Sequence, residues 1–599
     1  MPQLLLGQAG FERVYLFNDT NVRIMGVHPT DSSYYFLGNV GNNTNRLAQV
    51  FGELYLNGDV KNLYIQQVDT SLQYSGYTRN DLKLNNNGNF VFCYLSYATS
   101  GLDHANTPRL KIQKPTGEIV LDTLYTELWS VDSLLFFHLP TAPEIELLPD
   151  GSMLFGSSYW DLKTDTPDPW GFNGEVGTFV MKIAVDGTIL WSKRYKHLPF
   201  IPNGPIYAFL NLDVNSDGSF MVSYIDYEYD LNPNFGAGDW AKVYFTNCDV
   251  NGNIINTETF QETPFCWGSP AFQKLDDTSF LFTFFDTEIY DEPPLMNLSK
   301  QVLWKTRIYI DGGNSPGVGT SINDLVLKNG DVYCSLFLID KISQTSLIGF
   351  VSLNSISFET GEFNWQRRFN LFPEDSLEDP EFTVYDIDTT SDGGFILAGN
   401  CFRWSQNQGD KPRQYGYILK TNCLGFLGSP QAAVTVLSSS LDSVVFVNSS
   451  IQAGSYFWDF GDGNTLQTGE NSDTVSHVYA QAGTYTIKLI AEGCNSDNDT
   501  LTFSHTITSP PQSYGDGTLL SVFPNPTVSG QDATIYIGNI SGTHELVVTD
   551  LNGKKVASHS IEQGETTYFV PTTKFAKGMY QFSLLQNGEV REVEKLIIE

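Results

Sequence analysis

Residues 149–156 have the sequence P-D-G-S-M-L-F-G, in which a tight turn is followed at once by an apolar strand. Residues 216–223 (S-D-G-S-F-M-V-S) and 391–398 (S-D-G-G-F-I-L-A) repeat this order. Asp-Gly turns suit two-residue hairpins because glycine tolerates positive φ angles. The repeated stretch therefore predicts a series of antiparallel hairpins along the first part of the chain.

Two series of turns alternate over the first 430 residues. The first series comprises Asp31-Ser32, Asn87-Gly88, Pro149-Asp150-Gly151-Ser152, Ser216-Asp217-Gly218-Ser219, Asp277-Thr278, Asn329-Gly330 and Ser391-Asp392-Gly393-Gly394. The second comprises Asn57-Gly58, Thr116-Gly117, Asp186-Gly187, Asn251-Gly252, a weak Leu298-Ser299-Lys300, Thr360-Gly361 and Leu424-Gly425. Seven units of four antiparallel strands fit a seven-bladed β-propeller over residues 11–430. A parallel β-helix is the alternative, but it would need shorter rungs and no hairpins.

The two ends of the repeat predict how the ring closes. The seventh unit stops soon after residues 417–420 without a convincing fourth strand. Residues 11–17 stand before the first unit and resemble fourth strands such as residues 190–195. We therefore expect residues 11–17 to complete blade seven and hide edges that would invite aggregation.

The longer connections predict a ligand-binding face. In a four-stranded blade both tight turns lie on one face, and the other connections lie on the opposite face. Loops on a rigid scaffold concentrate binding residues, and exposed aromatic rings stack on sugars or insert into protein grooves. The candidate ligand-binding residues are Trp160, Trp170, Tyr227, Tyr229, Trp240 and Trp404. The alternative is that these aromatic side chains pack beneath their own loops.

The charge of the chain excludes some partners. The 68 acidic residues against 34 basic ones give a net charge of -34, which opposes binding to nucleic acid. No apolar run approaches the roughly 18 residues of a membrane-spanning helix. Asp213, Asn215 and Asp217 open a calcium-type loop, but Tyr224 occupies the position where a bidentate Glu is expected, so the alternative is a plain hairpin turn. No other cofactor is indicated.

The seven cysteines are sparse and odd in number, and they do not predict a disulfide framework or a zinc site. Cys401 and Cys423 should end antiparallel neighbouring strands at opposite ends, so we expect no bond between them. Residues 1–10 could be the remnant of a longer signal peptide.

A different pattern follows residue 430. Residues 456–463 (Y-F-W-D-F-G-D-G), 477–479 (H-V-Y) and 483–489 (G-T-Y-T-I-K-L) closely resemble the PKD (polycystic kidney disease) domain. The resemblance implies an immunoglobulin-like sandwich over residues 433–508 that acts as a spacer or binding module. We expect the residues Trp458, Phe460, Tyr479 and Tyr485 in or near its core. Asp459 and Asp462 could form a catalytic pair, but a structural turn is favoured.

Residues 509–517 have the composition of a linker, and residues 518–599 form the last segment. Its motifs V-F-P-N-P (522–526), D-L-N-G-K-K-V (550–556), G-M-Y (578–580) and E-K-L-I-I-E (594–599) resemble the type A C-terminal sorting domain of type IX secretion. The corresponding sorting-signal residues are Pro524, Asn525, Pro526, Asp550, Gly553, Gly578, Tyr580 and Lys595.

The resemblance implies a β-sandwich that engages the type IX machinery. It also implies passage through the periplasm of a Gram-negative bacterium, followed by release or attachment to surface lipopolysaccharide. Bacteria with this system can O-glycosylate D-[S/T]-[apolar/T] triplets, while composition and turn chemistry are the alternative explanation. The triplets contain Thr123, Ser133, Ser376, Thr389, Ser443, Thr474 and Thr500.

The fold class is therefore all-β, with a seven-bladed propeller followed by two immunoglobulin-like β-sandwich domains. The chain lacks an H-E-x-x-H motif and the sialidase box, and His28, His104, His138 and His197 could be solvated loop residues. We expect a non-catalytic surface protein that binds glycan or protein. The alternative is a secreted propeller enzyme, a hydrolase or lyase, that acts on polysaccharide.

Overall fold

The computed structural model divides the chain into two compact units, Met1–Gly428 and Ser429–Glu599. It describes residues 10–17, 20–42, 45–67, 72–74, 82–98, 107–125, 134–136, 143–163, 173–199, 207–227, 241–263, 272–274, 279–283, 294–299, 301–307, 324–341, 347–370, 380–403, 413–439, 443–470, 472–507, 520–523, 525–527, 533–538, 540, 542–562, 565, 567–571 and 575–598. Within these ranges the regular elements are β-strands and one short 3-10 helix, Cys494–Ser496. None of the described elements is a helix that could span a membrane.

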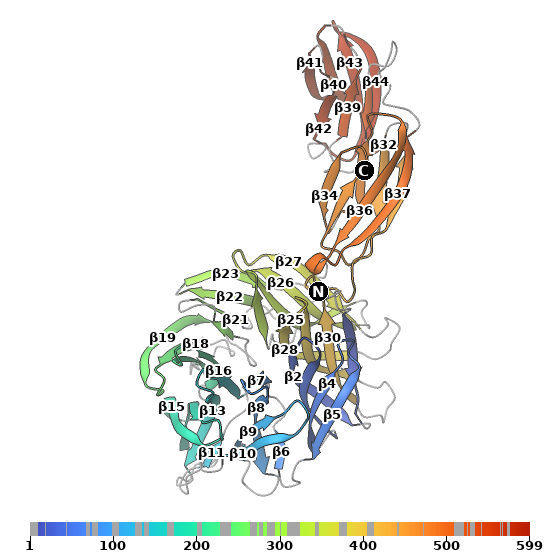
Figure 1. The fold of residues 1–599 in the computed structure, drawn as a ribbon. Helices are drawn as coiled ribbons and strands as arrows, with labels where there is room; N and C mark the ends of the chain where they lie inside the picture. Colours follow the sequence, from blue (N-terminus) through green and yellow to red (C-terminus); the bar gives the residue numbers. More distant parts are fainter. Residues whose placement is uncertain are drawn as a thin grey trace. The chain divides into compact units, whose positions relative to one another are not determined.

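The first unit contains seven antiparallel sheets arranged around a common centre (Figure 1). Blades one to three consist of β2 (Asn21–Pro29), β3 (Tyr34–Asn42), β4 (Asn45–Leu54) and β5 (Val60–Gln67); β6 (Leu72–Tyr74), β7 (Lys83–Leu84), β8 (Phe90–Ala98), β9 (Thr107–Gln113) and β10 (Ile119–Leu124); and β11 (Leu134–Phe136), β12 (Glu144–Leu147), β13 (Met153–Lys163), β14 (Asn173–Ile183) and β15 (Ile189–Pro199).

Blades four to seven complete the series. They consist of β16 (Tyr207–Val214), β17 (Phe220–Tyr227), β18 (Ala241–Cys248) and β19 (Ile254–Thr263); β20 (Phe272–Lys274), β21 (Ser279–Thr283), β22 (Pro294–Ser299) and β23 (Gln301–Arg307); β24 (Leu325–Lys328), β25 (Asp331–Lys341), β26 (Leu347–Ser357) and β27 (Phe363–Phe369); and β28 (Pro380–Thr389), β29 (Phe395–Arg403), β30 (Arg413–Thr421) and β1 (Phe11–Tyr15).

The seventh blade confirms the predicted closure of the ring. Its sheet has the order β1-β30-β29-β28, so the first strand of the chain supplies the fourth strand of the last blade. The pairing is antiparallel and runs from Phe11 opposite Lys420 to Tyr15 opposite Gly416. The pairing covers the edge of β30 that an open array would leave unpaired.

Blades two and three differ from the prediction of four strands. In each of them the innermost strand is divided into two short pieces that pair with the same neighbour. In blade three, β11 pairs with the end of β13 and β12 pairs with its beginning. The division places five strands in these sheets without changing the order of the blade.

A repeated joint, in which a tyrosine bonds the next blade, connects the fourth strands of blades two, three and seven to the blade that follows. Tyr125 and Tyr195 each donate a hydrogen bond of 2.9 Å to the carbonyl of the glycine in the following β-turn, Gly187 and Gly252 respectively. Tyr15 of β1 makes the equivalent 2.8 Å bond to the Gly58 carbonyl of blade one. The shared joint shows that β1 occupies the place of a fourth strand in its contacts as well as in its pairing.

Two features of this joint require glycine in the turn: a positive φ angle and a close contact with the preceding blade. Gly252 has a φ of 73°, which side chains rarely adopt, and a Cβ there would lie 2.9 Å from the Trp191 ring of the preceding blade. In the same way Gly58 has a φ of 84° and faces the ring of Phe11. The turn and the contact between blades therefore depend on the same residue.

Carboxylates on or beside the innermost strands also connect neighbouring blades. Asp386 accepts a 2.7 Å hydrogen bond from the Val27 backbone N–H, and Glu144 accepts one of 2.7 Å from that of Leu212. Both amides lie just after a register shift in their strands, where the pairing of the ladder is interrupted. The carboxylates thus bond amide groups close to these irregularities.

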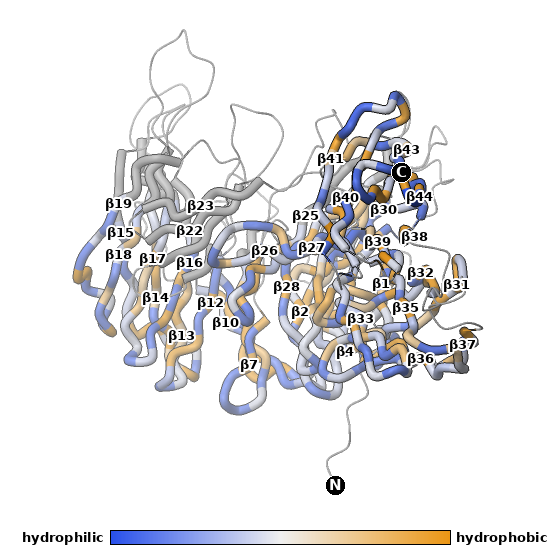
Figure 2. The backbone as a smooth tube through the Cα atoms, turned by 90° about the horizontal axis from the view of Figure 1, so that it is seen from above, coloured by the Kyte–Doolittle hydropathy of each residue, from blue (hydrophilic) through white to orange (hydrophobic). Residues whose placement is uncertain are grey.

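The blades bury their cores between successive sheets. One cluster joins Ile24 and Phe36 of blade one to Ile396 and Ile418 of blade seven. Hydrophobic residues, drawn in orange in Figure 2, follow strands such as β13 and β17, while many tight turns are blue. The packing between blades supplies the apolar burial that a single four-stranded sheet cannot provide.

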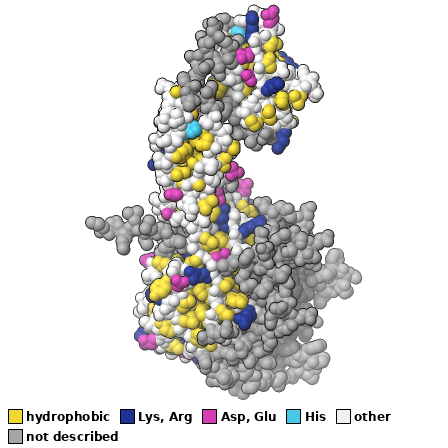
Figure 3. All heavy atoms as spheres, turned by 90° about the vertical axis from the view of Figure 1, so that its right-hand side faces the viewer, with side chains coloured by type: hydrophobic (Ala, Val, Ile, Leu, Met, Phe, Trp, Pro, Cys, Tyr) yellow, Lys and Arg dark blue, Asp and Glu magenta, His cyan; other side chains and the backbone are white. Residues whose placement is uncertain are grey.

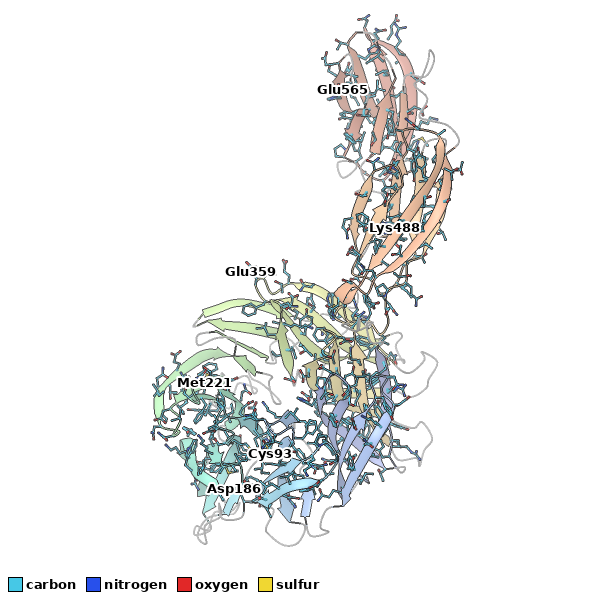
Figure 4. All side chains as sticks on the ribbon, in the orientation of Figure 1. Cys93, Asp186, Met221, Glu359, Lys488 and Glu565 are labelled. Atoms are coloured by element: carbon cyan, nitrogen blue, oxygen red, sulfur yellow. The ribbon has the colours of Figure 1, made fainter. Side chains whose placement is uncertain are left out.

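The cysteines partly contradict the sequence-based expectation. Cys93, Cys248, Cys334 and Cys401 retain their thiols and are buried, and Cys93 is labelled in the interior of the first unit in Figure 4. The absence of a bond between Cys401 and Cys423 is therefore confirmed. Cys423 and Cys494 are each disulfide-bonded, although the sparse cysteines do not predict a disulfide framework. Disulfides persist in the oxidising compartments that an exported protein enters.

The second unit begins with a sandwich of two antiparallel sheets. One contains β31 (Val434–Ser439), β32 (Ser443–Asn448) and β35 (Thr474–Val478). The other has the order β34 (Thr465–Gly469), β33 (Ser455–Asp459), β36 (Gly483–Glu492) and β37 (Asp499–Ile507). Trp458, Phe460 and Tyr479 are buried between them and Tyr485 packs against the cluster, as predicted.

A second sandwich follows. Its sheets have the orders β38 (Leu520–Phe523), β39 (Ala533–Ile537) and β42 (Thr567–Val570), and β41 (Lys555–Ile561), β40 (His544–Asp550), β43 (Gly578–Gln586) and β44 (Glu589–Ile598). Ile535, Leu546 and Phe582 are completely buried between them. On the face drawn in Figure 3 the charged side chains of this sandwich are scattered, with both signs present.

Candidate functional site

The blade topology separates two ends of the propeller. In blade three, β13 and β14 pair from Met153 opposite Ile183 to Lys163 opposite Asn173. The tight turns that contain Gly151 and Gly187 lie at the first end of this ladder, and the connection over residues 164–172 leaves from the other. Asp186, labelled in Figure 4, belongs to the second of these turns. Tight turns and longer connections thus occupy opposite ends, as the sequence predicts.

The aromatic residues predicted to bind ligand belong to the end with the longer connections. Trp160 lies on β13 opposite Val176, and Tyr227 lies on β17 opposite Ala241, three and zero residues from the paired ends. The side chains of these two residues are outside the description. Trp170, Tyr229, Trp240 and Trp404 lie outside the described residues altogether. Their role as a binding surface therefore stays a prediction.

The possible calcium residues hold a hairpin together. Asp217 accepts hydrogen bonds from the Ser219 backbone N–H at 2.9 Å and from its hydroxyl at 2.6 Å, which lower the pKa of the carboxyl. Asp213 accepts a 3.0 Å bond from the amide of Asn211, and the Asn215 amide bonds the Ser219 hydroxyl. The described residues contain no group of His, Cys, Asp or Glu arranged to hold a metal ion. The arrangement supports the alternative of a structural turn.

Of the four histidines considered in the propeller, one has a described side chain. His28 lies on β2 with its ring edge-on to Phe90, and burial lowers its pKa. His197 lies on β15 with its side chain undescribed, while His104 and His138 are outside the described residues. The neutral, packed state of His28 indicates a structural role.

The aspartates of the W-D-F-G-D-G motif also serve a turn. Asp459 accepts the Gly461 N–H at 2.9 Å, and Asp462 accepts the Asn464 N–H at 3.0 Å. Asp462 additionally lies 2.8 Å from His477, whose ring stacks on Phe460 with centroids 3.9 Å apart. These contacts tie the turn to strand β35. The sequence motif showed the histidine, but not that it pairs with the second aspartate.

Two motifs of the last sandwich form local turns. Asp550 accepts the backbone N–H groups of Asn552 and Lys554, both at 2.9 Å, while Gly553 has a φ of 77°. Near the start of β43, which begins at Gly578, Tyr580 donates a 2.8 Å hydrogen bond to the Ala576 carbonyl. These residues close the β40–β41 turn and fix the entry to β43.

The V-F-P-N-P motif, near the start of this sandwich, contacts its last strand. The Asn525 side-chain amide donates a hydrogen bond to the Lys595 carbonyl, and its Oδ1 accepts one of 3.0 Å from the Ile597 N–H. Thr527 continues this contact by donating from its N–H to the Ile597 carbonyl at 2.8 Å. Pro526 follows Asn525 in this segment, and Pro524 lies outside the described residues. The first motif of the sandwich thus holds its last strand, β44.

The proposed glycosylation positions differ in accessibility. Ser443 is 1% exposed, so its hydroxyl is inaccessible in the folded sandwich. Thr474 and Thr500 are exposed on strands β35 and β37, and Thr123 and Thr389 are partly exposed. Ser133 and Ser376 lie outside the described residues. Accessibility thus favours the two threonines in the first sandwich.

Comparison with known families identifies the two sandwiches. Residues 430–507 match the PKD domain, and residues 521–599 match the secretion system C-terminal sorting domain. The chain carries a type IX sorting domain behind a PKD domain. The family prediction from the sequence motifs is confirmed, and the sorting domain indicates export to the cell surface or secretion. No curated protein matches the sequence.

Several solved structures match the chain at low identity and low TM-score. Prolyl oligopeptidase B from Galerina marginata is 9% identical with a TM-score of 0.33; the alignment covers 74% of this chain and 55% of that protein. An α-L-arabinofuranosidase from Fusarium graminearum is 10% identical with a TM-score of 0.30, over 69% of this chain and 98% of that one. A thermostable family-43 glycoside hydrolase is 12% identical with a TM-score of 0.25, over 47% and 93%.

These neighbours correct one expectation. All three are enzymes, which contradicts the prediction that the protein has no catalytic activity. Their similarity assigns neither a reaction nor a catalytic residue to this chain.

Proposed function

We propose that the protein is exported cargo whose propeller recognises a glycan or a protein outside the cell, through the end of the blades that carries the longer connections. The sorting domain supplies the export step, and the type IX machinery is its partner. The observation that carries the proposal is the separation of short turns and longer connections at opposite ends of the blades. Connections that vary in length on a rigid scaffold are suited to recognition.

The contacts at the tight-turn end support this choice of face. The hydrogen bonds from Tyr15 to Gly58 and from Tyr195 to Gly252, and the contact of Trp191 with Gly252, hold neighbouring blades together there. A change in these turns would disturb the ring. The opposite end can vary in sequence without breaking those contacts, so we assign ligand recognition to it.

A glycan array probed with the exported protein tests the proposal. We expect saturable binding that Trp170→Ala or Trp240→Ala weakens by tenfold or more, because a stacked aromatic ring contributes on the order of 1–3 kcal/mol. Tyr55→Ala is the matched control, since Tyr55 is an aromatic residue 51% exposed beside a tight turn. Unchanged binding by both tryptophan variants, with loss of binding by the control, would place the ligand at the tight-turn end and contradict the proposal.

Polysaccharide hydrolysis and lyase assays on the same preparation address the enzymatic alternative. Product release that is lost in Trp170→Ala and Trp240→Ala but retained in Tyr55→Ala would assign turnover to the same face. Binding without product release would assign recognition alone.

A further inference from the structure

The contact between Asn525 and the last strand suggests more than a structural turn. Strand β44 is the edge of its sheet, because it pairs with β43 on one side and ends the order β41-β40-β43-β44. The backbone groups on its other side would face solvent unless something covers them. At Lys595 and Ile597 they are covered by the Asn525 side chain and by the backbone of Thr527.

The carboxamide of Asn525 replaces a peptide group of a neighbouring strand. It offers one donor and one acceptor on the same planar group, and both are used by consecutive outward-facing groups of β44. Thr527 then makes a parallel bridge to Ile598. This arrangement, a side-chain amide and one bridge residue, fixes the position of the last residues of β44 relative to the start of the sandwich.

We call the pair of hydrogen bonds from the Asn525 side chain to β44 the clamp. Its Asn525 side chain is exposed, which distinguishes its role from that of the buried core. Asn525 lies on the surface, whereas Leu596 and Ile598 of the same strand are buried. Exposed hydrogen bonds exchange with water and contribute little net stability, while the buried side chains anchor the strand. Removing the amide should therefore loosen the outer edge of β44 without unfolding the sandwich.

We infer that Asn525 is a positioning residue for export: its side-chain amide holds the outer edge of β44 at Lys595 and Ile597 in the arrangement that the secretion machinery recognises. The inference rests on the sorting role of residues 521–599 and is independent of any ligand of the propeller. It explains why the first motif and the last strand, 70 residues apart, belong to one signal.

The test compares matched variants of the full chain in its native host. Asn525→Ala removes both hydrogen bonds, and Asn525→Asp keeps the Oδ1 acceptor but directs a second carboxylate oxygen at the Lys595 carbonyl. Ile535→Val, in the buried core, provides a variant destabilised without touching the clamp. Gln581→Ala removes an exposed side-chain amide from β43 of the same domain, outside the quoted motifs. Deletion of residues 517–599 reports loss of the sorting domain.

Surface display and periplasmic accumulation are measured for each variant, together with hydrogen exchange over residues 589–599 of the purified chain. We expect display of both Asn525 variants to fall about tenfold, while exchange at Ile597 rises by about fivefold or less, corresponding to under about 1 kcal/mol. Ile535→Val and Gln581→Ala should be displayed normally.

Two results would overturn the inference. One is wild-type display of Asn525→Ala while the deletion is trapped in the periplasm; this refutes the clamp but leaves the sorting domain intact. The other is equal loss of display in Asn525→Ala and Ile535→Val, because general stability would then decide export. Display of the deletion itself would instead refute the sorting role.

Discussion

The strands at the two ends of the described chain, β1 and β44, are held in opposite ways. β1 lies against β30 with Phe11 and Tyr15 buried, and Glu12 accepts a 2.9 Å hydrogen bond from the buried Tyr417 hydroxyl. Like β1, β44 has a sheet neighbour on one side only, and backbone groups on its other edge are bonded by the exposed Asn525 amide and by Thr527. The first strand is enclosed by apolar packing, and the last stays accessible along part of its edge.

This difference shows how one kind of element serves two purposes. A strand that closes a ring gains stability from burial, because each buried aromatic contributes on the order of 2–3 kcal/mol. A strand that must be recognised by another protein needs a defined position with groups that remain reachable. Perturbing β1 should therefore change stability, and perturbing the clamp on β44 should change export with little change in stability.

The largest expected effect tests the burial of β1. Phe11→Ala removes a ring that packs on Gly58 and Tyr34, and we expect the propeller to lose about 3–5 kcal/mol of unfolding free energy. Calorimetry of the full chain measures the shift of the propeller transition. Arg13→Ala is the control on the same strand, since its ion pair with Asp59 is exposed and contributes under about 1 kcal/mol. Equal shifts in the two variants would contradict enclosure by packing.

A smaller effect isolates the joint between β1 and blade one. Gly58→Ala adds a Cβ at a φ of 84° and 2.7 Å from the Phe11 ring, whereas Gly88→Ala adds one at a φ of 70° with open space around it. Both pay the backbone strain of about 1–2 kcal/mol, but the first must also displace the ring. We expect Gly58→Ala to be the more destabilising in chemical denaturation. Identical denaturation midpoints would show that the contact between Gly58 and Phe11 does not contribute to closing the ring.

The third prediction concerns the pH dependence of closure. Burial raises the pKa of Glu12 to about 7, against an ordinary value of 4.5, and the Tyr417 hydrogen bond opposes this shift in part. The folded state therefore holds a proton that the unfolded state releases, so this contribution is complete below about pH 4.5 and is lost as the pH rises through 7.

Glu12→Gln keeps an acceptor for Tyr417 and removes the titration. The stability of the variant relative to the natural protein should increase by about 3 kcal/mol between pH 4.5 and pH 8, measured by thermal unfolding at intervals. A difference that does not vary with pH would show that the carboxyl is not enclosed in the folded ring.

The smallest expected effect completes the comparison at β44. Asn525→Ala should lower the unfolding free energy of the sorting domain by less than about 1 kcal/mol, because the amide is exposed. Thermal unfolding of full chains that carry Asn525→Ala or Phe11→Ala measures the two losses of unfolding free energy. A loss as large as that of Phe11→Ala would mean that Asn525 supports the core of the sandwich.

Much of the fold is predictable from the sequence, because its turns are local. The Asp-Gly and Asn-Gly pairs mark the described hairpins, and the likeness of residues 11–17 to a fourth strand predicts closure. The divided inner strands of blades two and three are not predicted, although Gly76 lies between the two pieces in blade two and Pro140 and Pro143 lie between those in blade three. The disulfide-bonded state of Cys423 and Cys494 is equally invisible in the spacing of cysteines.

Whether the contacts of a site residue could be predicted also depends on whether those contacts are local in sequence. Asp550 and Gly553 act within one turn, so their motif predicts their contacts. Asn525 bonds backbone groups 70 residues away, and nothing in the string V-F-P-N-P indicates this. Tyr195 could have been found from the sequence, because it follows Trp191 by four residues and Tyr125 follows Leu121 by the same spacing.

The pairing of β1 with β30 has a consequence for biogenesis. Residues 405 positions apart, Glu12 and Tyr417, must meet before the ring is complete, whereas each blade's own hairpins form between near neighbours. Contacts of such long range form slowly, and an unclosed array would present bare edges to other chains meanwhile. The ribosome releases β1 long before its partner exists, so a holding factor that shields the nascent repeat would limit aggregation until the seventh blade emerges.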